Sequence, residues 1–120
     1  MTKTNNTLKI INKLQDALEI PVKPFDTDIP EDCVIYKLDP VSDDGAVQQD
    51  RLKLRIIATT LLDAECLKYI IKKTLLAIGD NQAINGINSI TLNGGGSLKD
   101  YETNTVQIIM YFDIVSKSEI

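Results

Sequence analysis

Two stretches of this chain alternate between apolar and polar side chains, and this alternation constrains the fold more than any other feature. In residues 51–60 (RLKLRIIATT) the apolar positions are Leu52, Leu54, Ile56 and Ala58. In residues 102–115 the apolar face consists of Val106, Ile108, Met110, Phe112 and Ile114. Successive side chains of a strand point to opposite faces of a sheet, so both stretches are predicted to be long strands that cover a core with one face.

Two other stretches have helical spacing. Residues 6–19 are apolar at Leu8, Ile11, Leu14 and Leu18, and the helix is expected to end before Pro21 because a residue preceding proline disfavours α geometry. Residues 64–78 are predicted to form the second helix, with residue Asp63 as its N-cap and Gly79 just beyond its last turn. The proline-rich residues 21–32 are predicted to be an extended connector without regular structure.

Two shorter strands are predicted at residues 33–38 and 87–92, and poorly ordered loops at residues 39–50 and 93–97. The element order α-β-β-α-β-β predicts one α+β domain over residues 1–120. It would contain a single, mostly antiparallel four-stranded sheet with two helices on one face. The two long strands would lie beside each other at the centre of this sheet, with one short strand at each edge.

The composition excludes several kinds of chemistry. Histidine is absent, so a Ser-His-Asp triad, a Cys-His pair or a His-ligated metal site cannot be built within this chain. The two cysteines, Cys33 and Cys66, are too few for a structural zinc site or a disulfide scaffold, and both lie in apolar segments. They are predicted to be buried and reduced, as in the cytoplasm. We expect no catalytic residues, no metal and no cofactor, and hence a protein that is not an enzyme.

Charge and hydropathy narrow the range of partners. A formal net charge of -4 argues against affinity based on phosphate neutralisation, so no sequence-specific nucleic-acid partner is expected. No apolar run approaches the roughly 20 residues that span a bilayer, and the first residues lack the apolar core of a secretory signal. We therefore expect no membrane partner and no secretion.

Each predicted loop also resembles a ligand site. Residues 43–45, together with Asp39 and Asp50, have the carboxylates of a cation site, but they lack the EF-hand spacing, and Asp and Gly are equally typical of hairpin loops. Residues 94–96 are glycines, but a P-loop requires four residues between its glycines and then Gly-Lys-Ser/Thr at the start of a helix. An ordinary connecting loop is the favoured interpretation of both stretches.

The other faces of the two long strands are not plainly polar. Arg51, Lys53 and Arg55 form a basic stripe, which is either solvated or pairs with an acidic patch on another subunit. The last strand is half apolar on its second face, which consists of Gln107, Ile109, Tyr111, Asp113 and Val115. Because large exposed apolar patches mark contact surfaces, this pattern favours oligomerisation, although coverage by residues 21–32 would produce the same pattern.

Three segments carry a family resemblance: IPEDCVIYKLDPVSDDGAVQQDRLKLRII, the helix through LLAIGD, and LNGGGSLKDYETNTVQIIMYFDI. With these segments, the chain resembles the small tail-terminator (tail-to-head joining, tail-completion) proteins of long-tailed bacteriophages and prophages. The resemblance implies a structural virion-assembly protein that forms a ring, commonly a hexamer, capping the tail tube and joining it to the head connector. The implied partners are further copies of the chain, the tail-tube protein and the head-connector protein. The implied locations are the host cytoplasm during assembly and the head-tail junction of the virion.

The residues expected to contact partners or other subunits lie in the two loops and on the second faces of the long strands: Asp43, Asp44, Gly45, Arg51, Lys53, Arg55, Gly94, Gly95, Gly96, Ile109 and Tyr111. Other functions fit the same pattern. One is a head-completion or minor capsid protein of the same connector, and another is a small adaptor domain that binds a partner at a sheet edge. An enzyme using Asp43 and Asp44 alone is disfavoured because carboxylates in a flexible loop have no fixed geometry.

Overall fold

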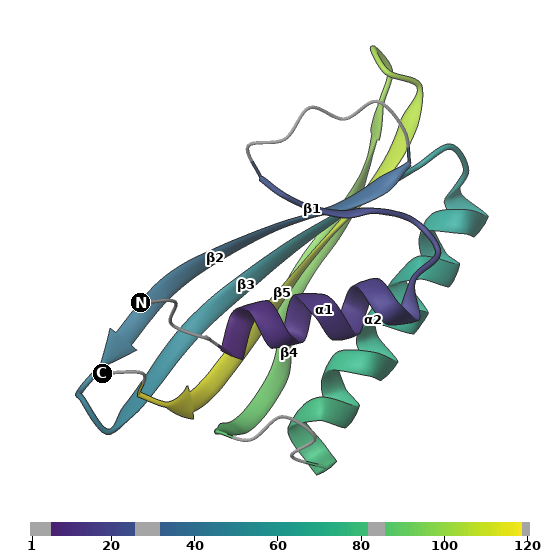
Figure 1. The fold of residues 1–120 in the computed structure, drawn as a ribbon. Helices are drawn as coiled ribbons and strands as arrows, with labels where there is room; N and C mark the ends of the chain where they lie inside the picture. Colours follow the sequence, from purple (N-terminus) through teal and green to yellow (C-terminus); the bar gives the residue numbers. More distant parts are fainter. Residues whose placement is uncertain (1–5, 26–31, 82–85, 119–120) are drawn as a thin grey trace.

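The computed structural model describes residues 6–25, 32–81 and 86–118. Two helices and five strands lie in these ranges, in the order α1 (Asn6–Ala17), β1 (Val22–Pro24), β2 (Cys33–Asp43), β3 (Val47–Ala58), α2 (Leu61–Asn81), β4 (Ile87–Asp100) and β5 (Thr105–Lys117). The strands form one sheet, and both helices lie on the same side of it (Figure 1). The molecule is elongated, with extents of 45 × 28 × 24 Å.

The sheet is mixed and has the strand order β1-β2-β3-β5-β4. The prediction of a four-stranded, mostly antiparallel sheet in the element order α-β-β-α-β-β is therefore wrong. The described residues contain a fifth strand, β1, which pairs in parallel with β2. The four longer strands are neighbours in the order expected for them, and each pairing among them is antiparallel.

β1 lies in the stretch that was predicted to be an irregular connector. Proline has no N–H to donate to a neighbouring strand, but an edge strand such as β1 does not need every donor. The Pro21 carbonyl accepts a hydrogen bond from the Val34 N–H (2.9 Å). From α1, the Gln15 side chain donates to the Ile20 carbonyl (3.0 Å) and accepts from the Val22 N–H (2.8 Å). Tertiary hydrogen bonds therefore hold this strand in place.

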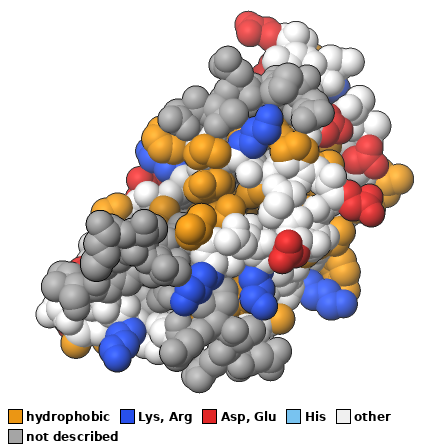
Figure 2. Space-filling model, in the orientation of Figure 1, with side chains coloured by type: hydrophobic (Ala, Val, Ile, Leu, Met, Phe, Trp, Pro, Cys, Tyr) orange, Lys and Arg blue, Asp and Glu red, His pale blue; other side chains and the backbone are white. Residues whose placement is uncertain are grey.

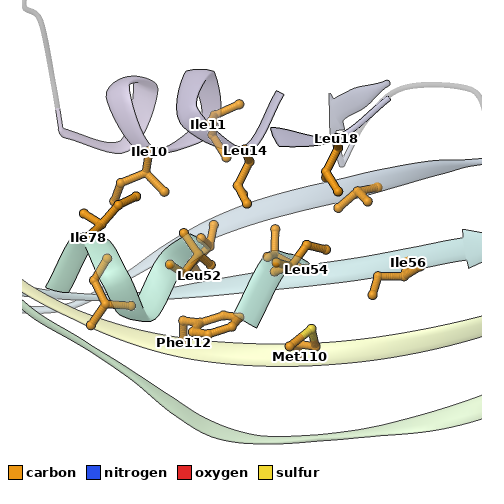
Figure 3. Packing of buried hydrophobic residues seen from close by; sticks show 14 of the residues in the cluster. Ile10, Ile11, Leu14, Leu18, Leu52, Leu54, Ile56, Ile78, Met110 and Phe112 are labelled. Atoms are coloured by element: carbon orange, nitrogen blue, oxygen red, sulfur yellow. The ribbon is translucent and has the colours of Figure 1, made fainter. Parts of the chain in front are cut away.

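The main core lies between the sheet and the two helices (Figure 3). The alternation predicted for β3 and β5 is confirmed, because their buried residues include Leu52, Leu54, Ile56, Ile108, Met110, Phe112 and Ile114. In α1 the predicted stripe is partly wrong, since Leu8 is 50% exposed and Ile10 is fully buried. Leu8 lies six residues before Leu14, which places it about 120° away around a helix of 3.6 residues per turn.

The ends of α2 also differ from the prediction. The Thr60 hydroxyl accepts a hydrogen bond from the Asp63 N–H (3.2 Å), so Thr60 and not Asp63 is the N-cap. Asp63 lies in the first turn, where its negative charge interacts favourably with the helix dipole and stabilises the helix. The helix does not end before Gly79, as predicted, but continues through it to Asn81. Beyond the helix, Gly86 has a positive φ of 97°.

Both predicted loops belong to strands, so this part of the prediction is wrong. β2 and β3 continue to a turn at residues 44–46, with an irregularity between Pro40 and Ser42. Residues 93–97 lie inside β4, which bulges between Leu92 and Gly95 and then pairs with β5 as far as residue 100. Turn-forming residues occur in bulges as well as in loops. The segment becomes a bulge when a neighbouring strand pairs with the residues on both sides of it.

The two cysteines have different environments. Cys33 is fully buried, as predicted, but Cys66 is exposed on α2, so the prediction that it is buried is wrong. We expect a thiol reagent to label Cys66 rapidly in the native protein and Cys33 only after unfolding. Ellman titration should therefore show one fast thiol, and Cys66→Ser should remove it. Rapid labelling of both thiols would contradict the burial of Cys33.

Candidate functional site

The side of the sheet that faces away from both helices is called the second face here. It carries the basic stripe and the half-apolar residues that the sequence singles out. The strand register places their side chains in rows across β2, β3 and β5: Ile35, Arg55 and Ile109; Lys37, Lys53 and Tyr111; Asp39, Arg51 and Asp113. The predicted contact residues of β3 and β5 therefore share one surface.

The second face is buried at one end and more open at the other. Cys33, Ile35 and Ile57 are no more than 8% exposed and form a small hydrophobic cluster separate from the main core. Further along the face, Ile109 and Tyr111 are half-buried. Neither α1 nor α2 covers this face (Figure 1). A partly apolar surface without a helix over it is suited to contact with another subunit.

A polar cluster ties three strands together at the open end. Asp113 on β5 accepts a hydrogen bond from Arg51 Nε on β3 (3.2 Å) and another from Asn93 Nδ2 on β4 (2.7 Å). Arg51 and Asp113 also form an ion pair, in which the Asp113 side chain is largely buried. Asn93 reaches this carboxylate from the β4 bulge. The bulge therefore has a structural role in the sheet.

A hollow of about 260 Å³ lies on the second face, between residues of β2 and β3 and the residue after β1. Its lining consists of Phe25, Ile35, Tyr36, Lys37, Lys53 and Arg55. The Lys37 ammonium lies 5.3 Å from the centre of the Phe25 ring, within cation–π range. Among the described residues, Lys53 and Arg55 form no ion pair. We call this feature the cationic hollow.

The charges of the helix side are arranged differently. The space-filling view in Figure 2, in the orientation of Figure 1, shows acidic and basic side chains scattered over that side with hydrophobic side chains between them. The helix side therefore carries charges of both signs.

The turn between β2 and β3 lies at one end of the molecule (Figure 1), and the carboxylates of Asp43 and Asp44 belong to it. Asp43 Oδ1 accepts a hydrogen bond from the Gly45 N–H (2.9 Å), and Asp44 Oδ1 accepts from the N–H groups of Ala46 (2.9 Å) and Val47 (2.8 Å). These residues therefore close the turn, where Gly45 has a positive φ of 89°. We call Asp43 and Asp44 the acidic tip.

The hydrogen bonds to Asp44 also favour its charged form. The N–H groups of Val47 and Ala46 lower the pKa of Asp44 because they stabilise its charged form. Since the pKa in the folded chain lies below its unfolded value, the charged carboxylate stabilises the turn at neutral pH. This stabilisation is lost as the pH falls through the folded pKa.

The glycine run in β4 is a bulge in an edge strand and does not resemble a phosphate-binding loop. Gly94 and Gly95 have positive φ angles of 93° and 148°. A Cβ atom on Gly95 would collide with the Ile109 carbonyl oxygen of β5, whereas a Cβ atom on Gly96 would meet nothing within 4 Å. No helix begins at this run, which a phosphate-binding P-loop requires.

The structure brings together some of the predicted contact residues and separates others. Gly96 lies opposite Ile109, in the same row as Arg55, but the acidic tip lies at one end of the hairpin, away from the rows that hold Lys53 and Arg55. Sequence reasoning missed Phe25, Lys37 and Asn93. Alternation along residues 33, 35 and 37 could have predicted that Lys37 lies on the second face. Phe25 lies beside Lys37 only because β1 pairs in parallel with β2, which the sequence does not indicate.

The described residues contain no obvious metal site or membrane span. No group of three or more Cys, Asp or Glu side chains lies close enough together in them to hold a metal ion. Neither of the two described helices is long and apolar enough to cross a bilayer.

Comparisons with known proteins identify the fold only. No model of a known protein family matches this sequence, and no curated protein matches it. A solved structure described as "Virion of native gene transfer agent (GTA) particle" contains a chain with a similar fold, with a TM-score of 0.60 and 11% sequence identity. The match covers 91% of this chain and 84% of that chain. The resemblance to tail terminators is not confirmed at the level of a family.

Proposed function

We propose that this protein is a structural virion component that forms a ring, which caps the tail tube of a phage-like particle and joins it to the head connector. The observation that carries this proposal is the second face, which is half apolar, rich in cations and not covered by α1 or α2. The fold shared with a chain of a gene transfer agent virion supports the coarser part of this proposal, a structural virion component.

The asymmetry of the surfaces supports a ring. Contacts between two different patches of identical subunits are heterologous, and they close into a ring when the rotation between neighbours allows it. The second face differs in shape and charge from the helix side and from the hairpin ends, so it is suited to this kind of contact. The net charge of -4 would also disfavour retention of DNA that passes through such a ring.

This role is structural and needs no catalytic residue. The chain has no histidine, so the common triads that activate a nucleophile cannot form within it. The carboxylates of Asp43 and Asp44 close a turn on the surface. We therefore propose that the protein is not an enzyme and that its partners are its own copies, the tube and the connector.

One alternative function, that of an adaptor domain, has specific support in the structure. The edge strand β4 is exposed along residues 91–99, and an exposed edge accepts an additional strand from a partner, as an adaptor domain would use it. A head-completion protein of the same connector would use the second face in the same way but would bind the connector and not the tube.

The proposed function is tested with the purified protein. We expect light scattering to give the mass of a closed ring, and negative-stain images to show rings with a central hole. Added to polymerising tail-tube protein, the ring should stop tube growth at a uniform length. A monomer at micromolar concentration would favour the adaptor function, and a ring that binds the connector but leaves tube growth unchanged would favour head completion.

A further inference from the structure

We propose that the acidic tip of the β2–β3 hairpin docks into the cationic hollow of the neighbouring copy in the ring. The occupant of the hollow is therefore a second copy of this chain. This contact rests on the proposed ring and specifies which two surfaces build it.

Within one chain the acidic tip and the hollow cannot meet. The acidic tip lies at the turn end of the hairpin, where Asp43 pairs with Gln48, whereas the cations of the hollow lie at Lys53 and beyond. Lys53 lies five residue steps along the strand from Gln48, which corresponds to about 17 Å at the usual rise per residue. A contact between tip and hollow must therefore join two molecules. Because the two surfaces differ, the contact is heterologous and propagates from copy to copy.

Charge complementarity supports this occupant. Between residues 39 and 50 the hairpin contains only acidic charges, with no Lys or Arg. Lys53 and Arg55 in the hollow form no ion pair among the described residues. The hydrogen bonds that close the turn use Oδ1 of Asp43 and Oδ1 of Asp44. A planar guanidinium such as that of Arg55 is well suited to bind a carboxylate.

Apolar groups accompany the charges on both sides. Val47 beside the tip is 42% exposed, and Phe25 at the rim of the hollow is 63% exposed. Contact between them would bury exposed hydrocarbon and would strengthen the ion pairs by excluding water. The tip lies at one end of an elongated molecule, so it can reach a neighbour without interference from the helices (Figure 1).

Two double variants and one control test this contact. Asp43→Asn with Asp44→Asn removes the charges and keeps the oxygen that closes the turn, and Lys53→Glu with Arg55→Glu reverses the hollow. We expect each to raise the dissociation constant of the ring at least tenfold, measured by light scattering over a dilution series. The control, Lys72→Glu with Lys73→Glu, makes the same charge change at exposed residues of α2 and should leave assembly unchanged.

Zero-length carbodiimide cross-linking tests the contact in the wild-type protein. The reagent adds no spacer, so a carboxylate is coupled only to an amine in direct contact with that carboxylate. In a mixture of isotope-labelled and unlabelled protein, we expect mass spectrometry to find Asp43 or Asp44 joined to Lys53 or Lys37 of the other label. High salt should reduce both this product and the ring.

The outcomes separate the contact from the proposed function. A wild-type monomer would overturn the ring and the contact with it. A wild-type ring that persists in both double variants, or one that cross-links only at other residues, would overturn the contact and leave the ring intact. Circular dichroism shows whether the Lys53→Glu, Arg55→Glu variant is unfolded. If it is unfolded, the contact is tested by the Asp43→Asn, Asp44→Asn variant and by the cross-link.

Discussion

Replacing Ile109 and Tyr111 together by Lys is expected to abolish assembly and to leave the monomer folded. Both side chains lie on the second face, whereas their neighbours Ile108, Met110 and Phe112 point into the main core. The substitution therefore leaves the main core unchanged. At a subunit contact it places two ammonium groups where they lose water without gaining a partner, which costs several kcal/mol.

Circular dichroism and light scattering measure the two effects separately. A matched control replaces Leu62 and Tyr69, which are 73% and 65% exposed on α2, by Lys. This control should remain folded and assemble like the wild type. If the Ile109 and Tyr111 variant unfolds, the second face packs within one chain. If it folds and assembles normally, the second face is not the ring interface.

Gly95→Ala is expected to destabilise the fold by about 2–5 kcal/mol, through backbone strain at positive φ and a steric clash. Gly95 has a φ of 148°, and its Cβ atom would collide with the Ile109 carbonyl oxygen on β5. Relief of this collision requires β4 to move away from β5 at the bulge. Asn93, which bonds to Asp113 from the same bulge, would move with it.

Gly96→Ala is the matched control, one residue along the same strand. A Cβ atom on Gly96 meets nothing within 4 Å, so this variant should be within about 1 kcal/mol of the wild type. Urea unfolding at one fixed protein concentration measures both variants, because assembly makes apparent stability depend on concentration. Equal stability of the two variants would contradict the strained geometry of Gly95.

The candidate site was only partly predictable from the sequence. Alternation placed Arg51, Lys53 and Arg55 on one face, and the structure confirms this because a strand that buries one face must turn the other away from the core. The expected role of the two loops as contact elements is not tested by the fold. The structure assigns them to a hairpin turn and an edge bulge, where they lie in different parts of the molecule.

The sequence alone predicted the two helices and the core faces of β3 and β5, because helical and strand periodicity are local properties of successive residues. It also determined that no histidine-based chemistry is available within the chain. The strand at residues 22–24 requires tertiary contacts, since β1 depends on the Gln15 side chain and on backbone pairing with β2. Likewise, only the neighbouring strand decided that residues 93–97 form a bulge, because the hydrogen bonds that extend a strand come from partners distant in sequence. The cationic hollow has the same origin: Phe25, Lys37 and Lys53 come from three segments, and no local pattern encodes their meeting.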